Sequence, residues 1–454
     1  MNWLIILCVS LGCLAYTKQV DEIQHKLNRI VASVDPNVRV GLEVVSLKNG
    51  LVLYQKDQNK LFLPASTLKT FTAAAALSIL GVDYRFETHL YIDGNDLYLK
   101  GSGDPSLTLD DLNNLAFQLK LQGIHEIEGD LIVDHSEFDD VSLGPGWMWD
   151  DGSSVDALTV NRNCIDLWIR PAASLSLPPL ILLDPETDYV SVSNRALTEK
   201  KGALKISKRF VTKEKRIEIG GNIRLNASPE KYSVAVDAPN LYAGYLLKQC
   251  LQAQGIDLKG HVRTGLTPQL AKSNACHPSS PLSVLVETMM KNSDDLYASC
   301  LFKKLGAYTQ GAPGTWEKGA RAVRAFLSKE AGLNVHHFTF VDGSGESRYN
   351  LISPHQMVQF LTWVHKQFAF APEFLTSLPI SGTDGTLKTR MCAIKGKVRA
   401  KTGCMTGVST LAGYIVTETG EWLAFSFCAE GILGSTDSFK TQLEDTLCQA
   451  LSEY

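Results

Sequence analysis

The sequence predicts an α/β protein in which one domain is assembled from both ends of the chain and carries inserted β-rich domains. Three observations predict it. A strand pair and an apolar helix occupy the first 80 residues, short strands fill the middle, and helices with a second strand pair return near the end. A chain of 454 residues exceeds one ordinary core, so two or three domains are expected. We assign 16–89 and 266–454 to the assembled domain and 90–265 to the insertion.

The N-terminal part begins with the strand pair VRVGLEVVSLKNGLVLYQ (38–55), joined by a turn at Lys48-Asn49-Gly50. In the middle part, segments such as THLYIDGNDLYLKGSGDPS and EIEGDLIVDHSEFDD predict further short strands. This part is expected to lack the long helices of the two flanks.

Helices return at 237–255, where Asp237 is expected to cap the first turn and Gly255 to end the helix. Ser353 and Pro354 predict another helix start. Two strands follow in STLAGYIVTETGEWLAFSFCAE, and a last helix begins at Asp437. Its apolar stripe is predicted to pack on a sheet. The stripe consists of Phe439, Leu443, Leu447 and Leu451.

The N-terminus predicts export. Residues 1–15 form an apolar stretch that is too short to span a bilayer and suits a secretory signal, with cleavage after Ala15, although no Lys or Arg precedes it. Two alternatives stay open: a buried first helix, and a lipoprotein anchored at Cys13 behind a poor lipobox. The net charge of −4 excludes a field that attracts nucleic acid or an anionic membrane, so neither a nucleic-acid partner nor a firm membrane anchor is expected.

Eight cysteines remain once the signal is removed. They are scattered singly without a CxxC pair, so no metal site is indicated, and the sequence cannot choose among their disulfide pairings. Most are expected to be small buried residues. The eight are Cys164, Cys250, Cys276, Cys300, Cys392, Cys404, Cys428 and Cys448.

A serine and a lysine open the apolar helix in LPASTLKTFTAAAALSILG (63–81). Ser66 and Lys69 are three residues apart, so both lie on one helix face, and a lysine amine can activate a weak serine nucleophile. The Ser66 N–H at a helix start can also face a developing oxyanion. The pair alone is a weak signal, because a solvated helix lysine is the alternative and the spacing recurs at Ser228 and Lys231.

Two later elements strengthen the pattern. MMKNSDDLYASCL (289–301) places Ser293 in a Ser-x-Asn-like position, and Lys401-Thr402-Gly403 enters a predicted strand along which a peptide substrate could lie. The three elements in this order form the signature of penicillin-interacting serine enzymes.

On these motifs the chain resembles the class C low-molecular-mass penicillin-binding proteins, which are D-alanyl-D-alanine carboxypeptidases and endopeptidases. The segments YLKGSGDPSL, PGWMWDD, LTVNRN, VDGSGESRYNLISP and LPISGTDGTLKTR are also similar to that family. The resemblance implies a β-lactamase/transpeptidase-like fold, an antiparallel sheet flanked by helices. It also implies a periplasmic enzyme that cleaves peptidoglycan stem peptides through a serine acyl-enzyme, uses no cofactor and is inhibited covalently by β-lactam antibiotics.

The resemblance also implies residue roles. Ser66 becomes the nucleophile, Lys69 the general base, and Ser293 the group that passes a proton to the leaving amine. The motif Lys401-Thr402-Gly403 would hold the substrate carboxylate, and the N–H groups of Ser66 and Cys404 would form the oxyanion hole. Residues matching the family's diaminopimelate-recognition segments are Asp150 or Asp151, Arg348, Met405 and Thr406. An exposed turn for the Asp pair and a surface ion pair for Arg348 stay open as alternatives.

Two positions depart from the family pattern and add negative charge near the expected cleft. Asp295 stands where the family has Asn, and Glu346 stands where it has Leu. A carboxylate beside Lys69 would favour its ammonium form and oppose its action as a base. Two rival functions remain: a β-lactamase, and a non-catalytic peptidoglycan-binding protein in which Asp295 marks lost activity.

Overall fold

Strands from the two chain ends form one five-stranded antiparallel sheet in the order β18-β19-β20-β1-β2. The structure, a computed structural model, describes residues 19–147, 154–202, 210–211 and 215–454. The strands are β1 Arg39–Ser46, β2 Val52–Lys56, β18 Val398–Met405, β19 Val408–Val416 and β20 Trp422–Glu430. The turn that joins β1 to β2 lies at Lys48-Asn49-Gly50 as predicted, with Gly50 at a φ of +75°. An α/β domain built from both chain ends is confirmed.

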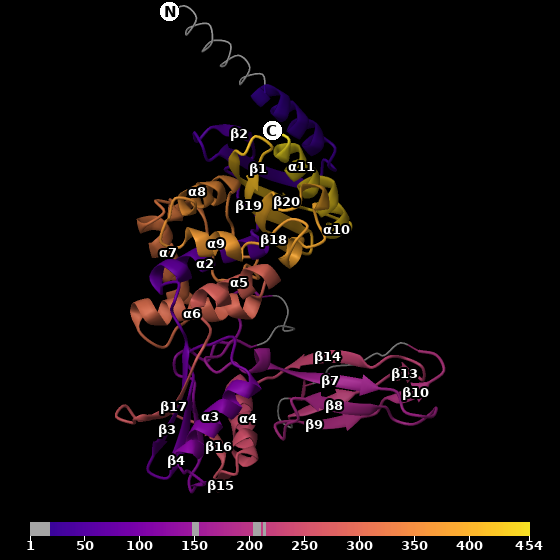
Figure 1. Cartoon of the computed structure of the whole chain (residues 1–454). Coiled ribbons are helices and arrows are strands. Elements are labelled where there is room, and N and C mark those ends of the chain that lie inside the picture. Colours follow the sequence, from indigo (N-terminus) through magenta and orange to yellow (C-terminus); the bar gives the residue numbers. More distant parts are fainter. Residues whose placement is uncertain (1–18, 148–153, 203–209, 212–214) are drawn as a thin grey trace, which may run out of the picture.

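Helices cover both faces of this sheet (Figure 1). On one face lie the helix at residues 19–32, the wide-turn helix Lys440–Asp445 and α11 (Thr446–Ser452). The other face meets α8 (Pro354–Val364) and α2 (Lys69–Ile79). Strand β19 shows the alternation behind this arrangement, because Leu411 and Ile415 enter the first core while Ala412 and Tyr414 enter the second.

The C-terminal helix packs on the sheet as predicted. It starts as α10 (Thr436–Phe439), widens through Lys440–Asp445 and continues as α11. Leu443, Leu447 and Leu451 are buried in one core with the sheet. Helix α8 also begins as predicted, with Pro354 in its first turn and Ser353 Oγ accepting a hydrogen bond from Gln356 N.

A helical layer completes this domain and carries several site residues. Its members are α5 Leu282–Asn292, α6 Asp295–Gln310, α7 Trp316–Lys329 and α9 Ala371–Ser377. Together with α2 and α8 they share the largest apolar core of the chain. The C-terminal end of α5 and the N-terminal end of α6 are therefore held beside the start of α2.

The inserted part holds a second five-stranded sheet, ordered β16-β6-β4-β3-β17, with its own apolar core. The strands are β3 Glu87–Asp93, β4 Asp96–Lys100, β6 Leu131–Asp134, β16 Val262–Thr264 and β17 Ser273–Pro278. Helices α3 (Leu109–Leu121) and α4 (Pro239–Ala253) pack on it. The pairing of β3 with β17 closes this unit at residues 87 and 278, just outside the predicted limits of 90 and 265.

Smaller sheets form a lobe beside α3 and α4 (Figure 1). One sheet contains β7 Cys164–Arg170, β8 Leu180–Asp184 and β14 Glu230–Ala235. A second contains β9 Ser191–Asn194, β11 Phe210–Val211 and β12 Arg216–Ile219. A further pair in the lobe is β10 Leu197–Glu199 with β13 Asn222–Arg224. The pair β5 Glu126–Ile127 with β15 Asp257–Leu258 lies outside the lobe, at the end of the α3/α4 unit. The insertion is strand-rich, as expected.

Three expectations were wrong. The middle part does contain a long helix, α3, which starts from a capping box between Thr108 and Asp111. Asp237 does not cap α4, because Pro239 occupies its first turn and the Asp237 carboxylate accepts a hydrogen bond from Tyr189 Oη. Only four of the eight cysteines are buried, namely Cys250, Cys300, Cys428 and Cys448.

Candidate active site

The structure brings Ser66 and Lys69 together. Ser66 lies in a one-turn 3₁₀ helix, Ala65–Leu68, that continues directly into α2, so the predicted helix start is a tighter turn than expected. Lys69 is fully buried, and its Nζ donates to Ser66 Oγ over 2.8 Å. A buried amine in contact with a serine hydroxyl is the arrangement that nucleophilic catalysis requires.

Lys69 has two further acceptors. Its Nζ donates to Ser344 O over 2.7 Å and to Asp295 Oδ1 over 2.5 Å. Three acceptors match the three N–H donors of an ammonium group. The side chain of Lys69 is 0% exposed and that of Asp295 is 47% exposed, so the ion pair sits at the edge of solvent. The contact of Asp295 with Lys69 that the sequence suggested is therefore present, and it places a carboxylate beside the lysine amine.

Ser293 contacts a second buried lysine. It follows the last residue of α5 in the left-handed region, at φ 58° and ψ 41°. A serine held in this sparsely populated conformation marks a site where the surrounding structure fixes the backbone. Lys401, which is also fully buried, donates from Nζ to Ser293 Oγ over 2.8 Å and to Thr402 O over 2.7 Å. Burial, followed by the positive charge of Lys69, lowers the pKa of Lys401 well below its usual value.

Strand β18 passes close to the backbone of Ser66. A Cβ on Gly403 would lie 3.0 Å from Ser66 N and 2.2 Å from Thr410 Oγ1, so this position requires glycine. Thr410 Oγ1 also donates to Pro64 O over 2.8 Å, which ties β19 to the same turn. Cys404, the next residue on β18, is exposed. The close approach places Ser66 and Cys404 together on the lining of one cleft.

A cleft of about 600 Å³ opens in front of these groups. Sequence reasoning missed several of its residues, among them Thr386, whose hydroxyl receives a 2.8 Å hydrogen bond from Thr402 Oγ1. The loop that carries Thr386 is anchored by Lys291, which donates to both oxygens of Asp384. The lining consists of Ser66, Ser293, Thr386, Thr389, Arg390, Thr402, Cys404, Asp437, Lys440 and Thr441. The segment LPISGTDGTLKTR, which is similar to the family, contains this part of the lining, but its sequence did not indicate which of its residues face the cleft.

The proposed diaminopimelate group is placed only in part. Arg348 Nη2 donates to Thr406 O over 3.0 Å, beside the β18–β19 turn that follows Met405. Asp150 and Asp151 lie outside the described residues.

Asp342 fixes the loop that carries Glu346 and Arg348. Its carboxylate accepts hydrogen bonds from the N–H groups of Gly345 and Ser347, both over 2.8 Å. Glu346 is half-buried, and burial and then the charge of Asp295 raise its pKa. Both departures from the family pattern therefore lie in one electrostatic environment around Lys69.

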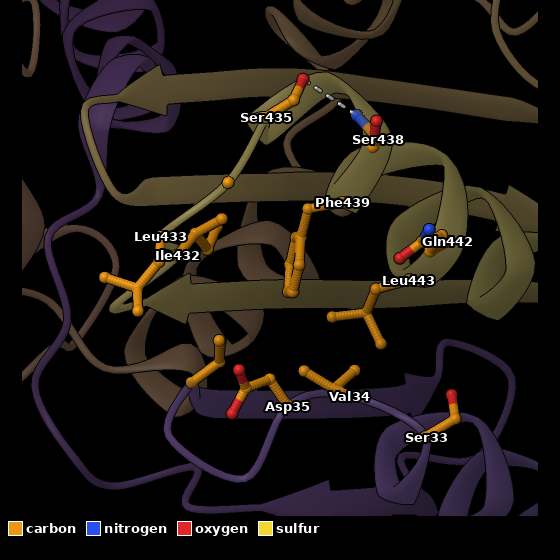
Figure 2. Close-up of a pocket in the computed structure, with 12 residues that line it drawn as sticks. Ser33, Val34, Asp35, Ile432, Leu433, Ser435, Ser438, Phe439, Gln442 and Leu443 are labelled. Atoms are coloured by element: carbon orange, nitrogen blue, oxygen red, sulfur yellow. Dashed lines mark hydrogen bonds between the residues drawn. The ribbon is translucent and has the colours of Figure 1, made fainter.

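A second cavity, of about 270 Å³, lies between the N-terminal helix end and the 432–443 segment (Figure 2). Its lining shares no residue with the catalytic cleft, although Ser438, Phe439 and Gln442 alternate along the chain with cleft residues Asp437, Lys440 and Thr441. The lining is Ser33, Val34, Asp35, Val38, Ile432, Leu433, Gly434, Ser435, Ser438, Phe439, Gln442 and Leu443. The two cavities therefore share one helical wall.

The fold and the Ser66–Lys69 pair beside β18 define a serine peptidase of the penicillin-interacting class. The chain matches the D-Ala-D-Ala carboxypeptidase 3 (S13) family over residues 23–452, and it belongs to that family. Among the helices that the structure describes, none combines the length and the apolar composition needed to cross a membrane.

Characterised relatives agree with this assignment. The chain is 34% identical over 446 residues to the D-alanyl-D-alanine carboxypeptidase of Actinomadura sp. (strain R39), covering 91% of this chain and 81% of the relative. It is 31% identical over 411 residues to D-alanyl-D-alanine carboxypeptidase DacB of Haemophilus influenzae, covering 85% and 84%. The crystal structure of penicillin binding protein 4 from H. influenzae superposes with a TM-score of 0.81, at 28% identity and 96% and 99% coverage. The β-lactamase/transpeptidase-like fold and the serine carboxypeptidase class are confirmed.

Proposed function

We propose that this protein removes the terminal D-alanine of peptidoglycan stem peptides and cleaves D-Ala–diaminopimelate cross-links through an acyl-enzyme on Ser66. The observation that carries the proposal is the contact between Ser66 Oγ and the buried Lys69 Nζ, next to the close approach of Gly403. Attack by Ser66 on the D-Ala carbonyl forms the ester and releases the terminal amino acid. Water then hydrolyses the ester and returns the free serine.

Each of the two buried lysines takes part in a different proton transfer. Lys69 takes the Ser66 proton once its own proton has left to solvent, and Asp295, at 2.5 Å from Lys69 Nζ, opposes that loss as a countercharge. Ser293, hydrogen-bonded to Lys401, passes a proton to the leaving amine. The N–H groups of Ser66 and Cys404 stabilise the oxyanion of the tetrahedral intermediate.

Substrate recognition uses both ends of the leaving group. Lys401, Thr402 and the Thr386 hydroxyl bonded to Thr402 form the site for the terminal carboxylate. An incoming carboxylate supplies the countercharge that the buried Lys401 lacks. Arg348, Met405 and Thr406, with Asp150 or Asp151, recognise the charged end of diaminopimelate.

The cellular setting follows from the substrate. Peptidoglycan lies outside the cytoplasmic membrane, and residues 1–15 have the composition of an export signal, so the mature protein acts in the periplasm. β-Lactams acylate Ser66 as substrate mimics. The H. influenzae relative supports this, because one of its crystal structures is described as complexed with a β-lactam.

The test is D-alanine release from a diaminopimelate-type stem pentapeptide, together with peptide mapping after penicillin treatment. Wild type should release D-alanine and carry the penicillin adduct on the fragment containing residues 64–69. Ser66→Ala should do neither. Ser228→Ala, at the second Ser-x-x-Lys copy, is the matched control and should behave as wild type. An adduct on Ser228, or undiminished release by Ser66→Ala, would refute the assignment. Rapid steady hydrolysis of a cephalosporin without D-alanine release would identify a β-lactamase instead.

A further inference from the structure

The inserted sheet brings three metal-ligating side chains together outside the catalytic cleft. Glu87 and His89 are two residues apart on β3 and therefore point to the same face of the sheet. Cys276 on β17 is the direct cross-strand partner of His89. A glutamate, a histidine and a cysteine thus share one patch of an antiparallel strand pair.

Their donor atoms are close enough to bind one ion. All three lie within 4.8 Å of one another. His89 Nε2 is 3.1 Å from Glu87 Oε2 and 3.9 Å from Cys276 Sγ. Tetrahedral ligands at zinc bond lengths lie roughly 3.3–3.8 Å apart, so the patch needs side-chain shifts of about one ångström at most.

The hydrogen bonds around His89 decide which ring nitrogen is free. Ser273 Oγ donates its proton to Ala275 O over 3.0 Å. The same oxygen lies 2.9 Å from His89 Nδ1, so it accepts the Nδ1–H. In the neutral imidazole, Nε2 then presents its lone pair to the Glu87 carboxylate and the Cys276 thiol. A metal-bound histidine is oriented in this way, by a hydrogen bond from its other nitrogen.

A cavity of about 380 Å³ adjoins the patch and leaves room for a water ligand. The three cationic groups along it have other partners: Arg85 donates to Ser279 O, Lys304 pairs with Glu137, and Lys100 lies 3.9 Å from Asp134. We propose that Glu87, His89 and Cys276 bind a divalent transition-metal ion of the zinc class. One sulfur, one nitrogen and one oxygen donor suit Zn²⁺ and Co²⁺ better than Mg²⁺ or Ca²⁺. The ion joins β17 to β3, where the chain leaves and re-enters the catalytic domain.

The sequence missed this site because its ligands are 187 residues apart and include only one cysteine (276 − 89 = 187). Local spacing rules for zinc sites find ligands that are neighbours in the chain. Here the β3–β17 register brings them together instead.

The test is titration of the metal-free full-length protein with Co²⁺, followed by competition with Zn²⁺. Wild type should bind one Co²⁺ with a thiolate-to-cobalt charge-transfer band, and Zn²⁺ should abolish the band. Cys276→Ser should lose the band, and His89→Gln should bind at least about tenfold more weakly. Cys392→Ser, which removes an exposed thiol outside the patch, is the matched control and should keep the band.

Penicillin acylation provides the check on folding, because none of these residues lies in the catalytic cleft. All variants should acylate like wild type. The absence of stoichiometric Co²⁺ binding in wild type would show that His89 only forms an ion pair with Glu87, and it would overturn the proposal. A band that survives in both Cys276→Ser and His89→Gln would also overturn it.

Discussion

Two fully buried lysines serve one cleft, and their surroundings differ in charge. Lys69 contacts Ser66 and also the carboxylate of Asp295 at 2.5 Å. Lys401 contacts Ser293 and a backbone carbonyl, and burial lowers its pKa well below the usual value. Lys69 therefore has a carboxylate at ion-pair distance, whereas burial disfavours the ammonium form of Lys401.

The difference between the two lysines indicates a separate role for each in the proposed mechanism. Among the described residues no carboxylate forms an ion pair with Lys401, and the charge of Asp295 only partly offsets the effect of burial on its pKa, so a substrate carboxylate can supply a closer countercharge. Lys69 already has a countercharge, so it must release a proton before it can act as a base. Asp295 is thus the residue that makes the two lysine environments unlike, and removing it should make them more alike.

Of the substitutions proposed, the removal of Lys69 should have the largest effect on the acylation rate. Lys69→Met should lower the rate constant of penicillin acylation by about 10³-fold, within the range for loss of a general base. The variant also leaves Asp295 without its partner. Stopped-flow acylation with a fluorescent penicillin measures the effect. Undiminished acylation would show that another group activates Ser66.

Removing Lys401 should act mainly on substrates with a free carboxylate. Lys401→Met should lower kcat/KM for a D-Ala-D-Ala peptide by about 10²-fold, because a charge-assisted contact in a dry site is lost. In wild type, KM should rise as pH rises through the lowered pKa of Lys401, since the neutral amine binds a carboxylate poorly. The control is the same peptide with a C-terminal amide, which should show neither effect. Equal losses for both peptides would argue against a carboxylate site.

Neutralising Asp295 should make the surroundings of Lys69 more like those of Lys401. Asp295→Asn should raise the acylation rate at neutral pH by about tenfold, because it replaces the carboxylate that contacts the Lys69 amine with a neutral amide. The control is the same substitution in Lys69→Met, where the gain should vanish. A gain of equal size in both backgrounds would show that Asp295 acts on the substrate and not through Lys69.

Replacing Glu346 should have the smallest effect of the four substitutions, and this effect should be on the stability of the fold. Its pKa is raised in the folded protein, so the folded state holds the proton more tightly than the unfolded chain does. Ionising Glu346 therefore destabilises the fold, increasingly as pH rises above its unfolded value. Glu346→Gln should raise stability at pH 7 by less than about 1 kcal/mol, since the group is half-exposed, and by nothing near pH 4. Thermal unfolding at both pH values measures this. An equal change at both would exclude ionisation as the cause.

The sequence could predict the parts of the molecule that depend on local pattern. The Ser66–Lys69 contact follows from helical spacing, and the Lys48–Gly50 turn from hairpin chemistry. The Lys401–Ser293 contact joins residues 108 apart, and the bond of Thr386 to Thr402 depends on how a loop is anchored, so neither could be derived from spacing. Helix α3 was missed because its strand-rich surroundings outweighed its capping box. Resemblance to the family located the motifs, but only the structure showed that Asp295 reaches Lys69.

The most direct test of the account is the acylation rate constant measured against pH for wild type and Asp295→Asn. If Asp295 holds Lys69 as an ammonium, wild type should acylate more slowly at neutral pH. The deficit should shrink steadily as pH rises if deprotonation of the base limits acylation. Two superimposable profiles would contradict the account, because they would mean that the 2.5 Å ion pair has no influence on the base that activates Ser66.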